Sequence, residues 1–346
     1  SRDTLRAQNR RFGALGLTDL LKRLDAPATE LVIVNPAYFG TLTRIANEGG
    51  VQGMKWFLRF RVVHRLAPDL DRPFRAAHEQ FFAQTLRGLP AGPSRTEHLQ
   101  NLLRQQLPGL VDSSYNARYA PEHRRQRASV VIDAVRNAAV ELIGKSDARA
   151  AERLAKARID VAGSTTPAFD GSGLEFRTND HVGNLQRLWR WREAAVLANR
   201  HVTVDPVPAH LPTVLWIADT ATLTVSAAAL ASPLLFEGGS APPASDFGAL
   251  GALVGHEFSK AIDAGSRGAN LGSLFNGLQV APNLRVDGAR TLAMNRADLS
   301  GLEFAWTAFT TTQPQADTKA KQAFFTAWAG LWATTQTTDA LRALLK

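Results

Sequence analysis

Cysteine is absent from this chain of 346 residues, and methionine occurs only twice. Without cysteine the protein can form no disulfide bond, no thiolate zinc site and no cysteine nucleophile, and nothing indicates its redox compartment. Apolar runs of the roughly 18–20 residues that a membrane-spanning helix needs are also absent. With 45% hydrophobic and 21% charged residues, the composition is that of a soluble globular protein of one large domain or two.

The opening residues, SRDTLRAQNRRFG, lack the apolar core of a signal peptide. Because the chain starts at Ser1 rather than at methionine, earlier removal of a leader is compatible with the sequence. The compartment is therefore left open between secreted, periplasmic and cytoplasmic.

The net charge is +9, which can indicate binding to nucleic acid or to another acidic surface. The surplus is mostly arginine spread along helical patterns, and its densest stretch is HRRQR at 123–127. The sequence has neither a long basic tail nor an RNA-binding signature. We therefore expect neither nucleic acid nor membrane as a partner.

The first 200 residues place apolar side chains at three- and four-residue spacing, which predicts a mostly helical lobe over 1–200. One exception is the β-branched run at 31–34, which precedes Asn-Pro and predicts a short strand or an extended lead-in. The helical segments are LTDLLKRL, FGTLTRIANEG, MKWFLRFRVVHRLA, HEQFFAQTLRGL, LQNLLRQQL, RASVVIDAVRNAAVELIG and DARAAERLAKARID.

The pattern changes after about residue 200. Residues 201–230 contain prolines and β-branched residues, which predict a short sheet or hairpin, and FEGGSAPPAS at 236–245 predicts a loop. Three helices are predicted to follow, FGALGALVGHEFSKAID, AMNRADLSGLEFAWTAF and DTKAKQAFFTAWAGLWATT. Asp246 is predicted to cap the first of them.

The stretch GALVGHEFSKAIDA, at 251–264, begins like the helix of a zinc peptidase. Such a helix reads H-E-x-x-H, in which two histidines one turn apart hold the metal and the glutamate is the general base. Here His256 and Glu257 are present, but Lys260 stands at the position of the second histidine.

Several motifs, in order, resemble the neprilysin-like zinc peptidases of family M13. The family helix reads approximately G-G-I-G-x-V-I-G-H-E-x-T-H-x-F-D, and this chain has GALGALVGHEFSKAID. The family motif G-E-N-x-A-D-x-G-G corresponds to AMNRADLSG at 293–301, and VLWIADTATLTVSAAAL takes the place of the family's substrate strand and the segment after it. The amino-terminal segments that are similar are VNPAYFGTLTRI, MKWFLRFRVVHRLA and LPGLVDSSYNARYAPE.

The resemblance implies a mainly α (α+β) fold. It comprises a helical amino-terminal lobe over 1–200, a thermolysin-like zincin lobe with a small sheet over 201–346, and a cleft between them. In the family, the zinc ligands are the two helix histidines and the glutamate of G-E-N-x-A-D. By resemblance these positions hold His256, Lys260 and Met294. The family's substrate-binding Asn-Ala pair is also missing from VLWI, and the second lobe lacks the family's last segment, since the sequence ends at LRALLK.

Other parts of the family site are retained. Glu257 matches the general base, and Asp298 matches the aspartate that orients the first zinc histidine. Asn295 and Asp263 also match family positions. A lysine ammonium must lose a proton before it can coordinate a metal, and a thioether suits Cu(I) rather than zinc. We therefore expect no cofactor and no working zinc site.

The acidic groups suggest a reason for Lys260. Without zinc, Glu257 and Asp298 would lie close together without a compensating cation, and uncompensated buried charge is costly. We expect the Lys260 ammonium to pair with Glu257 at i,i+3 and to replace the charge of the metal. The alternative is that Lys260 points into solvent.

Three functions follow from the resemblance. The leading one is a pseudopeptidase whose interlobe cleft binds a peptide, a small molecule or a partner protein. The second is a metal-free enzyme that uses His256, Glu257, Lys260 and Asp298 as acid/base groups. The third is a metallopeptidase with ligands from elsewhere. The histidines outside the motif are His64, His78, His98, His123, His181, His201 and His210, and no two of them have H-x₃-H spacing.

Overall fold

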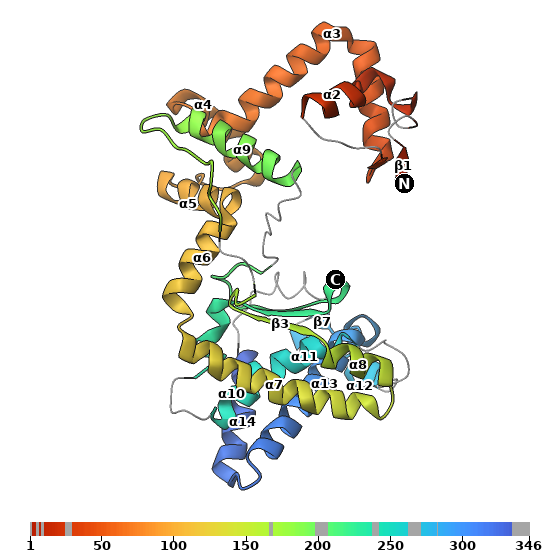
Figure 1. The fold of residues 1–346 in the computed structure, drawn as a ribbon, viewed down its shortest axis with the longest axis vertical. Helices are drawn as coiled ribbons and strands as arrows, with labels where there is room; N and C mark the ends of the chain where they lie inside the picture. The colour runs from red at the N-terminus through yellow and green to blue at the C-terminus, as the bar shows by residue number, and fades with distance from the viewer. Residues whose placement is uncertain are drawn as a thin grey trace. The chain divides into compact units, whose positions relative to one another are not determined.

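The computed structural model describes residues 2–4, 7, 10–24, 30–165, 169–197, 207–236, 242–261, 271–281 and 283–333. It is mostly helical with three small sheets, as predicted (Figure 1). No helix in these ranges is long and apolar enough to cross a bilayer.

The chain forms two compact units, which differ from the expected single boundary at 200. Unit 1 comprises Ser1–Gln106 and Asp170–Val202, and unit 2 comprises Leu107–Phe169 and Thr203–Lys346. The segment from 107 to 169 belongs to unit 2 because helix α7 (Glu122–Gly144) packs on the helices that carry the H-E motif. Its apolar face, which includes the fully buried Val131 and Val135, is part of the core of that unit.

Unit 1 is built around the long helix α3, Pro36–Leu66. Asn35 caps it by accepting a hydrogen bond from Tyr38 N–H at 3.0 Å. Gly50 kinks it, with φ of 58°, a conformation that glycine adopts at little cost. The expected short strand is β2. The other elements of the unit are β1 (Arg2–Thr4), η1 (Gly13–Leu15), α2 (Leu17–Arg23), β2 (Glu30–Val32), η2 (Ala67–Asp69), α4 (Arg72–Glu79), η3 (Gln80–Thr85), α5 (Arg95–Gln106) and α9 (His181–Leu197).

Asp69 joins three of these elements. His98 of α5 and His181 of α9 each place Nε2 2.8 Å from Asp69 Oδ1. Burial acts to raise the pKa of Asp69, but the hydrogen bonds from His181 and His98 outweigh it, so the pKa lies below its ordinary value.

Unit 2 contains the predicted sheet, with strand order β3-β5-β4. Strand β4 (Val214–Ile217) turns back to pair antiparallel with β5 (Thr222–Val225), which confirms the predicted hairpin, and β3 (Arg158–Val161) joins β5 in parallel. Among the described residues β4 is therefore an edge strand. The remaining elements of this unit are α6 (Pro108–Tyr119), α8 (Ala148–Ala155), η4 (Ala218–Thr220), η5 (Ala227–Leu230), α12 (Leu271–Phe275), β6 (Gln279–Ala281), β7 (Leu284–Arg285) and α14 (Thr318–Leu331).

The H-E helix runs without interruption through α10 (Ala244–Asp246), a π-helical segment η6 (Phe247–Gly251) and α11 (Ala252–Ser259). The prediction that Asp246 caps it is wrong, because the helix already begins at Ala244 after Pro243. Asp246 is instead fully buried and accepts hydrogen bonds from Arg127 Nε at 2.7 Å and Phe236 N–H at 2.9 Å. Its carboxylate ties the start of the helix to α7.

Helix α11 crosses α13 (Gly288–Thr312) at two glycines. A Cβ at Gly255 would lie 2.5 Å from the Gly301 carbonyl oxygen, and a Cβ at Gly301 would collide with the backbone of His256. The two backbones are therefore in direct contact, and this contact fixes the position of α11 relative to α13.

We expect Gly301→Ala to lower the free energy of unfolding by about 1–3 kcal/mol, because a methyl group has no space between the helices. Urea unfolding measures the change. Gly330→Ala is the matched control, since Gly330 is an exposed residue of α14 with nothing within 4 Å of its Cβ position. An equal effect of the two substitutions would contradict the close crossing.

The lowered pKa of Asp69 predicts an acid-dependent loss of stability in unit 1. At a pH above 3.8, the ordinary pKa of an aspartate, the hydrogen-bonded carboxylate of Asp69 stabilises unit 1. This contribution disappears as the pH falls through the lowered pKa that Asp69 has in the folded state. Hydrogen exchange in α5 and α9 should accelerate in that window. In Asp69→Asn the same amides should already exchange faster at neutral pH and show a smaller acid-dependent change.

Candidate functional site

The H-E motif lies at the end of α11, where it faces α13 and strand β4. His256 and Glu257 are buried, each with 7% of the residue exposed. Lys260 follows as the C-cap of α11, and Asp298 comes from the middle of α13. The α11–α13 crossing places the last two turns of one helix beside the aspartate of the other.

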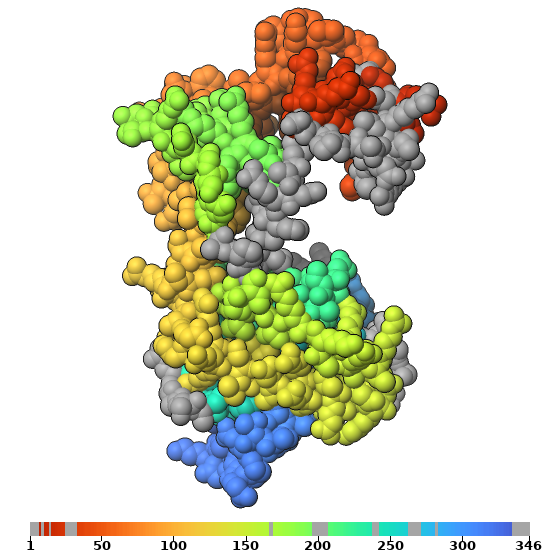
Figure 2. Space-filling model, in the orientation of Figure 1, coloured from red at the N-terminus to blue at the C-terminus, as the bar shows by residue number. Residues whose placement is uncertain are grey.

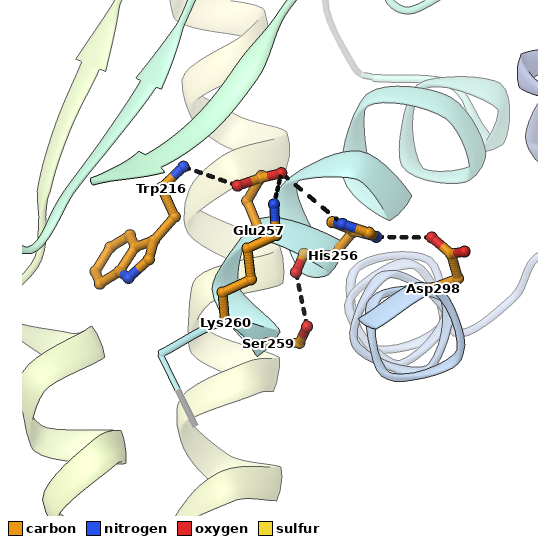
Figure 3. Close-up of polar contacts among 6 residues, drawn as sticks. All are labelled: Trp216, His256, Glu257, Ser259, Lys260 and Asp298. Carbon is orange, nitrogen blue, oxygen red and sulfur yellow. Dashed lines mark hydrogen bonds and ion pairs between the residues drawn. The ribbon is translucent and has the colours of Figure 1, made fainter. Parts of the chain in front are cut away.

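Four polar contacts connect the cluster (Figure 3). His256 Nδ1 lies 2.7 Å from Asp298 Oδ1. Lys260 Nζ donates to Glu257 Oε1 at 2.6 Å, and the Trp216 backbone N–H donates to Glu257 Oε2 at 2.8 Å. His256 Nε2 is 3.9 Å from Glu257 Oε1, beyond hydrogen-bond range.

The predicted ion pair of Lys260 and Glu257 is thus present, and Lys260 does not simply point into solvent. The i,i+3 spacing places both side chains on one face of the helix. The Lys260 side chain is 40% exposed and that of Glu257 is 9% exposed, so the ammonium approaches the carboxylate from the solvent side. The cluster holds two carboxylates, and Lys260 places its ammonium group against one of them.

Glu257 makes an unusual pair of contacts for a general base. One oxygen accepts from an ammonium, and the other accepts from the backbone of an edge strand. Together the two contacts fix the orientation of the carboxylate. Nothing in the sequence indicates the second contact, because a backbone N–H can be supplied by any residue except proline.

The donor set does not fit a catalytic zinc ion. Such a site needs three protein ligands and an open position, and of the three family positions only His256 carries a suitable donor. Lys260 is a cation bonded to Glu257, and Met294, one turn before Asp298 on α13, is a thioether with 55% of the residue exposed. Within the ranges that the structure describes, no group of three histidine, cysteine, aspartate or glutamate residues is placed to hold a metal ion.

The other residues singled out from the sequence lie elsewhere. Asn295 bonds along its own helix to Thr291 Oγ1 at 3.1 Å. The ring of His210 contacts Tyr115 of α6. Asp263 and His201 lie outside the described residues.

Comparison with known structures supports the M13 fold. The chain is similar to the zinc metalloprotease Zmp1 of Mycobacterium tuberculosis in its open state, with 21% identity and a TM-score of 0.83, covering 99% of this chain and 60% of that one. It is also similar to PepO from Lactobacillus rhamnosis, with 19% identity and a TM-score of 0.75, covering all of this chain and 59% of that one. A third similar structure is the Haemonchus galactose-containing glycoprotein complex, with 18% identity, a TM-score of 0.57, and 92% and 55% coverage. The chain thus spans about 60% of the length of Zmp1 and PepO.

Family models agree with the structural similarity. An amino-terminal model of peptidase family M13 matches residues 4–158, and a second model of the same family matches residues 264–346. Neither match includes His256, Glu257 or Lys260, and of these three residues only Lys260 departs from the family motif. Together the two matches cover more than half of the chain and occur in the order that the family requires. The chain belongs to peptidase family M13.

Proposed function

We propose that this chain is a pseudopeptidase, an M13-fold protein in which the catalytic zinc site has become a metal-free ligand-binding site. The observation that carries the proposal is the 2.6 Å contact between Lys260 Nζ and Glu257 Oε1. It puts a fixed side-chain cation beside the carboxylate that the family uses as general base, at the helix position where the family has a metal ligand.

The surroundings of Glu257 argue against water activation. A general base needs a free oxygen within hydrogen-bond reach of the proton that it removes. Here Lys260 donates to one oxygen of Glu257 and Trp216 N–H donates to the other, so each oxygen already has a donor from the protein. The carboxylate is therefore suited to holding its neighbours in place rather than to accepting a proton.

A peptide is the ligand class that the site fits best. Strand β4 is at the edge of its sheet in the described part of the chain, and edge strands bind extended peptides through their backbone groups. The side chains of Lys260 and Asp298 are 40% and 30% exposed, so both can reach a bound molecule. The remaining ammonium protons of Lys260 can bond a peptide carbonyl or a small anionic group.

A second candidate function rests on the His256–Asp298 contact of 2.7 Å. A histidine oriented by a carboxylate is a common acid/base pair, and Nε2 of this histidine has no hydrogen bond to Glu257. Metal-free hydrolysis of a small substrate would use this pair. In that case Asp298→Asn should abolish turnover even at saturating substrate, because His256 loses the carboxylate that orients it.

The first test is the metal content of the purified protein after zinc loading and dialysis. We expect the wild type to retain less than about 0.1 zinc per chain and the Lys260→His/Met294→Glu variant about one, because the variant restores a three-ligand set. Adding His256→Ala to the variant should remove the zinc again. Tightly held stoichiometric zinc in the wild type would contradict the proposal and make an active metallopeptidase the leading function. A variant without zinc would contradict the assignment of the ligand positions.

The second test measures the Lys260–Glu257 interaction by a double-mutant cycle. Lys260→Met should cost about 1–3 kcal/mol of unfolding free energy, because the buried Glu257 loses a charged partner. Glu257→Gln in the same background should recover much of the loss. The control is Lys156→Met, since Lys156 and Glu152 are also 2.6 Å apart but their side chains are 75% and 65% exposed, so little change is expected. An equal loss of unfolding free energy in Lys260→Met and Lys156→Met would show that Lys260 does not compensate the charge of a buried carboxylate.

A further inference from the structure

Four of the eight histidines of the chain lie together in unit 1, each on a different helix. They are His64 of α3, His78 of α4, His98 of α5 and His181 of α9, and Asp69 of η2 contacts the last two. We call these five residues the histidine cluster. Histidine is the residue type whose charge ordinarily changes between pH 5 and 8. Five elements of unit 1 therefore meet at side chains of the type that responds to mild acid.

One half of the histidine cluster contains a carboxylate. His98 Nε2 and His181 Nε2 each lie 2.8 Å from Asp69 Oδ1, and the two imidazole side chains are 21% and 34% exposed. Helix α9, which carries His181, lies at the surface of unit 1, where its green atoms adjoin the orange atoms of the preceding helices (Figure 2). A proton that either ring takes from solvent forms an ion pair with Asp69. Mild acid therefore preserves the contacts of α5 and α9 with η2.

The other half consists of ring contacts. The ring centres of His64 and His78 are 5.8 Å apart, and both rings pack on Phe82 of η3, at 4.9 Å and 4.6 Å. Both histidines are half-buried. We call His64, His78 and Phe82 the ring stack. It connects α3, α4 and η3 through aromatic surfaces.

The charged groups around the ring stack are bases. Burial lowers the pKa of His78 below its ordinary value of 6.5, and the positive charges of His64, Arg87 and His98 lower it further. Arg87 is held there because its Nε donates to the Phe82 carbonyl oxygen at 2.9 Å. Each of these neighbours disfavours a proton on His78.

The acidic groups close by in the chain are engaged elsewhere. Glu79 follows His78 directly, but its Oε1 accepts a hydrogen bond from Gly92 N–H at 2.7 Å. Asp69 is connected to the ring stack through its contact with His98, but it also binds His181. One carboxylate is thus shared by two imidazoles before any charge develops on His64 or His78.

The elements that the ring stack joins have little apolar packing. Within the part of the chain that the structure describes, α4 has no buried residue, and the buried residue of η3 is Ala83. Helix α7 of unit 2, by contrast, buries a whole apolar face. Segments with few buried contacts open at low free energy. The ring contacts therefore matter more for α4 and η3 than they would for a helix with its own apolar core.

We propose that the histidine cluster is an acid-sensitive switch, in which protonation of His64 and His78 releases α4 and η3 from α3 while Asp69 keeps α5 and α9 in place. Two imidazolium rings 5.8 Å apart repel each other. Salt screens this repulsion only in part, because the Debye length is about 8 Å at physiological ionic strength. Arg87 and a protonated His98 add to the repulsion. Separation of the elements relieves it and returns the charged rings to water.

The sign of the pH effect follows from the lowered pKa of His78. The open state, in which the ring has its ordinary pKa of 6.5, binds a proton more readily than the closed state. The closed state is therefore most stable above pH 6.5 and loses stability as the pH falls from 6.5 to the lowered pKa. This loss begins far above pH 3.8, the ordinary pKa of Asp69, so the two acid effects are separate.

Hydrogen exchange of the purified chain, followed by mass spectrometry, tests the switch between about pH 7.5 and about pH 5. The rates are divided by those of an unstructured peptide at the same pH. We expect corrected exchange in α4 and η3 to rise at least about tenfold in acid, because a pKa about one lower in the closed state favours opening tenfold. Helix α7 of unit 2 should show no such change.

Variants assign the response to the ring stack. His64→Phe/His78→Phe keeps two rings against Phe82 but removes both titrating groups, so α4 and η3 should exchange equally slowly at the two pH values. His78→Phe alone should reduce the response, and it serves if the double variant does not fold. His123→Phe is the matched control, since His123 is exposed on α7, and it should respond as the wild type does.

Two results would overturn the proposal. One is equal corrected exchange of α4 and η3 at the two pH values in the wild type. The other is a pH response that persists in His64→Phe/His78→Phe, because it would then come from groups outside the ring stack. None of these residues belongs to the Lys260 site, so the zinc content of the Lys260→His/Met294→Glu variant tests the proposed function separately.

Discussion

The arrangement of this site depends on a positive charge beside a buried carboxylate. Glu257 is almost fully enclosed by α11, β4 and the neighbouring helices, and an ionised carboxylate in such a place needs a cation or several hydrogen bonds. Lys260 supplies the cation from within the same helix, and Trp216 supplies a hydrogen bond from the adjacent strand. The Trp216–Glu257 hydrogen bond thus joins β4 to α11, and the Lys260–Glu257 ion pair within α11 holds the same carboxylate in place.

The glycine crossing sets the other half of the site. Because Gly255 and Gly301 let α11 and α13 meet backbone to backbone, His256 comes within 2.7 Å of Asp298, three residues before Gly301. A larger residue at either glycine would separate the helices and break that contact. The orientation of His256 is therefore a consequence of helix packing.

Features set by local spacing could be predicted from the sequence. Lys260 and Glu257 face the same way because of their i,i+3 spacing, and the hairpin of β4 and β5 follows from β-branched segments on either side of a turn. Features set by long-range packing could not. Whether residues 107–169 join unit 1 or unit 2 depends on which helices α7 covers. Asp246 looks like a helix cap, but the buried Arg127, 119 residues away in sequence, determines its role. The Trp216–Glu257 hydrogen bond could not be predicted either, because its donor is a backbone N–H group.

The two units also differ in what they require for stability. In unit 2 the fully buried Phe247, Phe258, Phe304 and Phe309 form a continuous apolar core with α7. Burial of such side chains stabilises a fold by about 1.5–3 kcal/mol each, so unit 2 has a source of stability that involves no bound metal, in contrast to small domains that depend on a structural metal. Among its described residues, unit 1 has no core of that size, and its longest helix exposes Trp56 and Phe60 on one side and Leu58 and Val62 on the other. The stability of unit 2 therefore rests mainly on this apolar core and not on the polar cluster of His256, Glu257, Lys260 and Asp298.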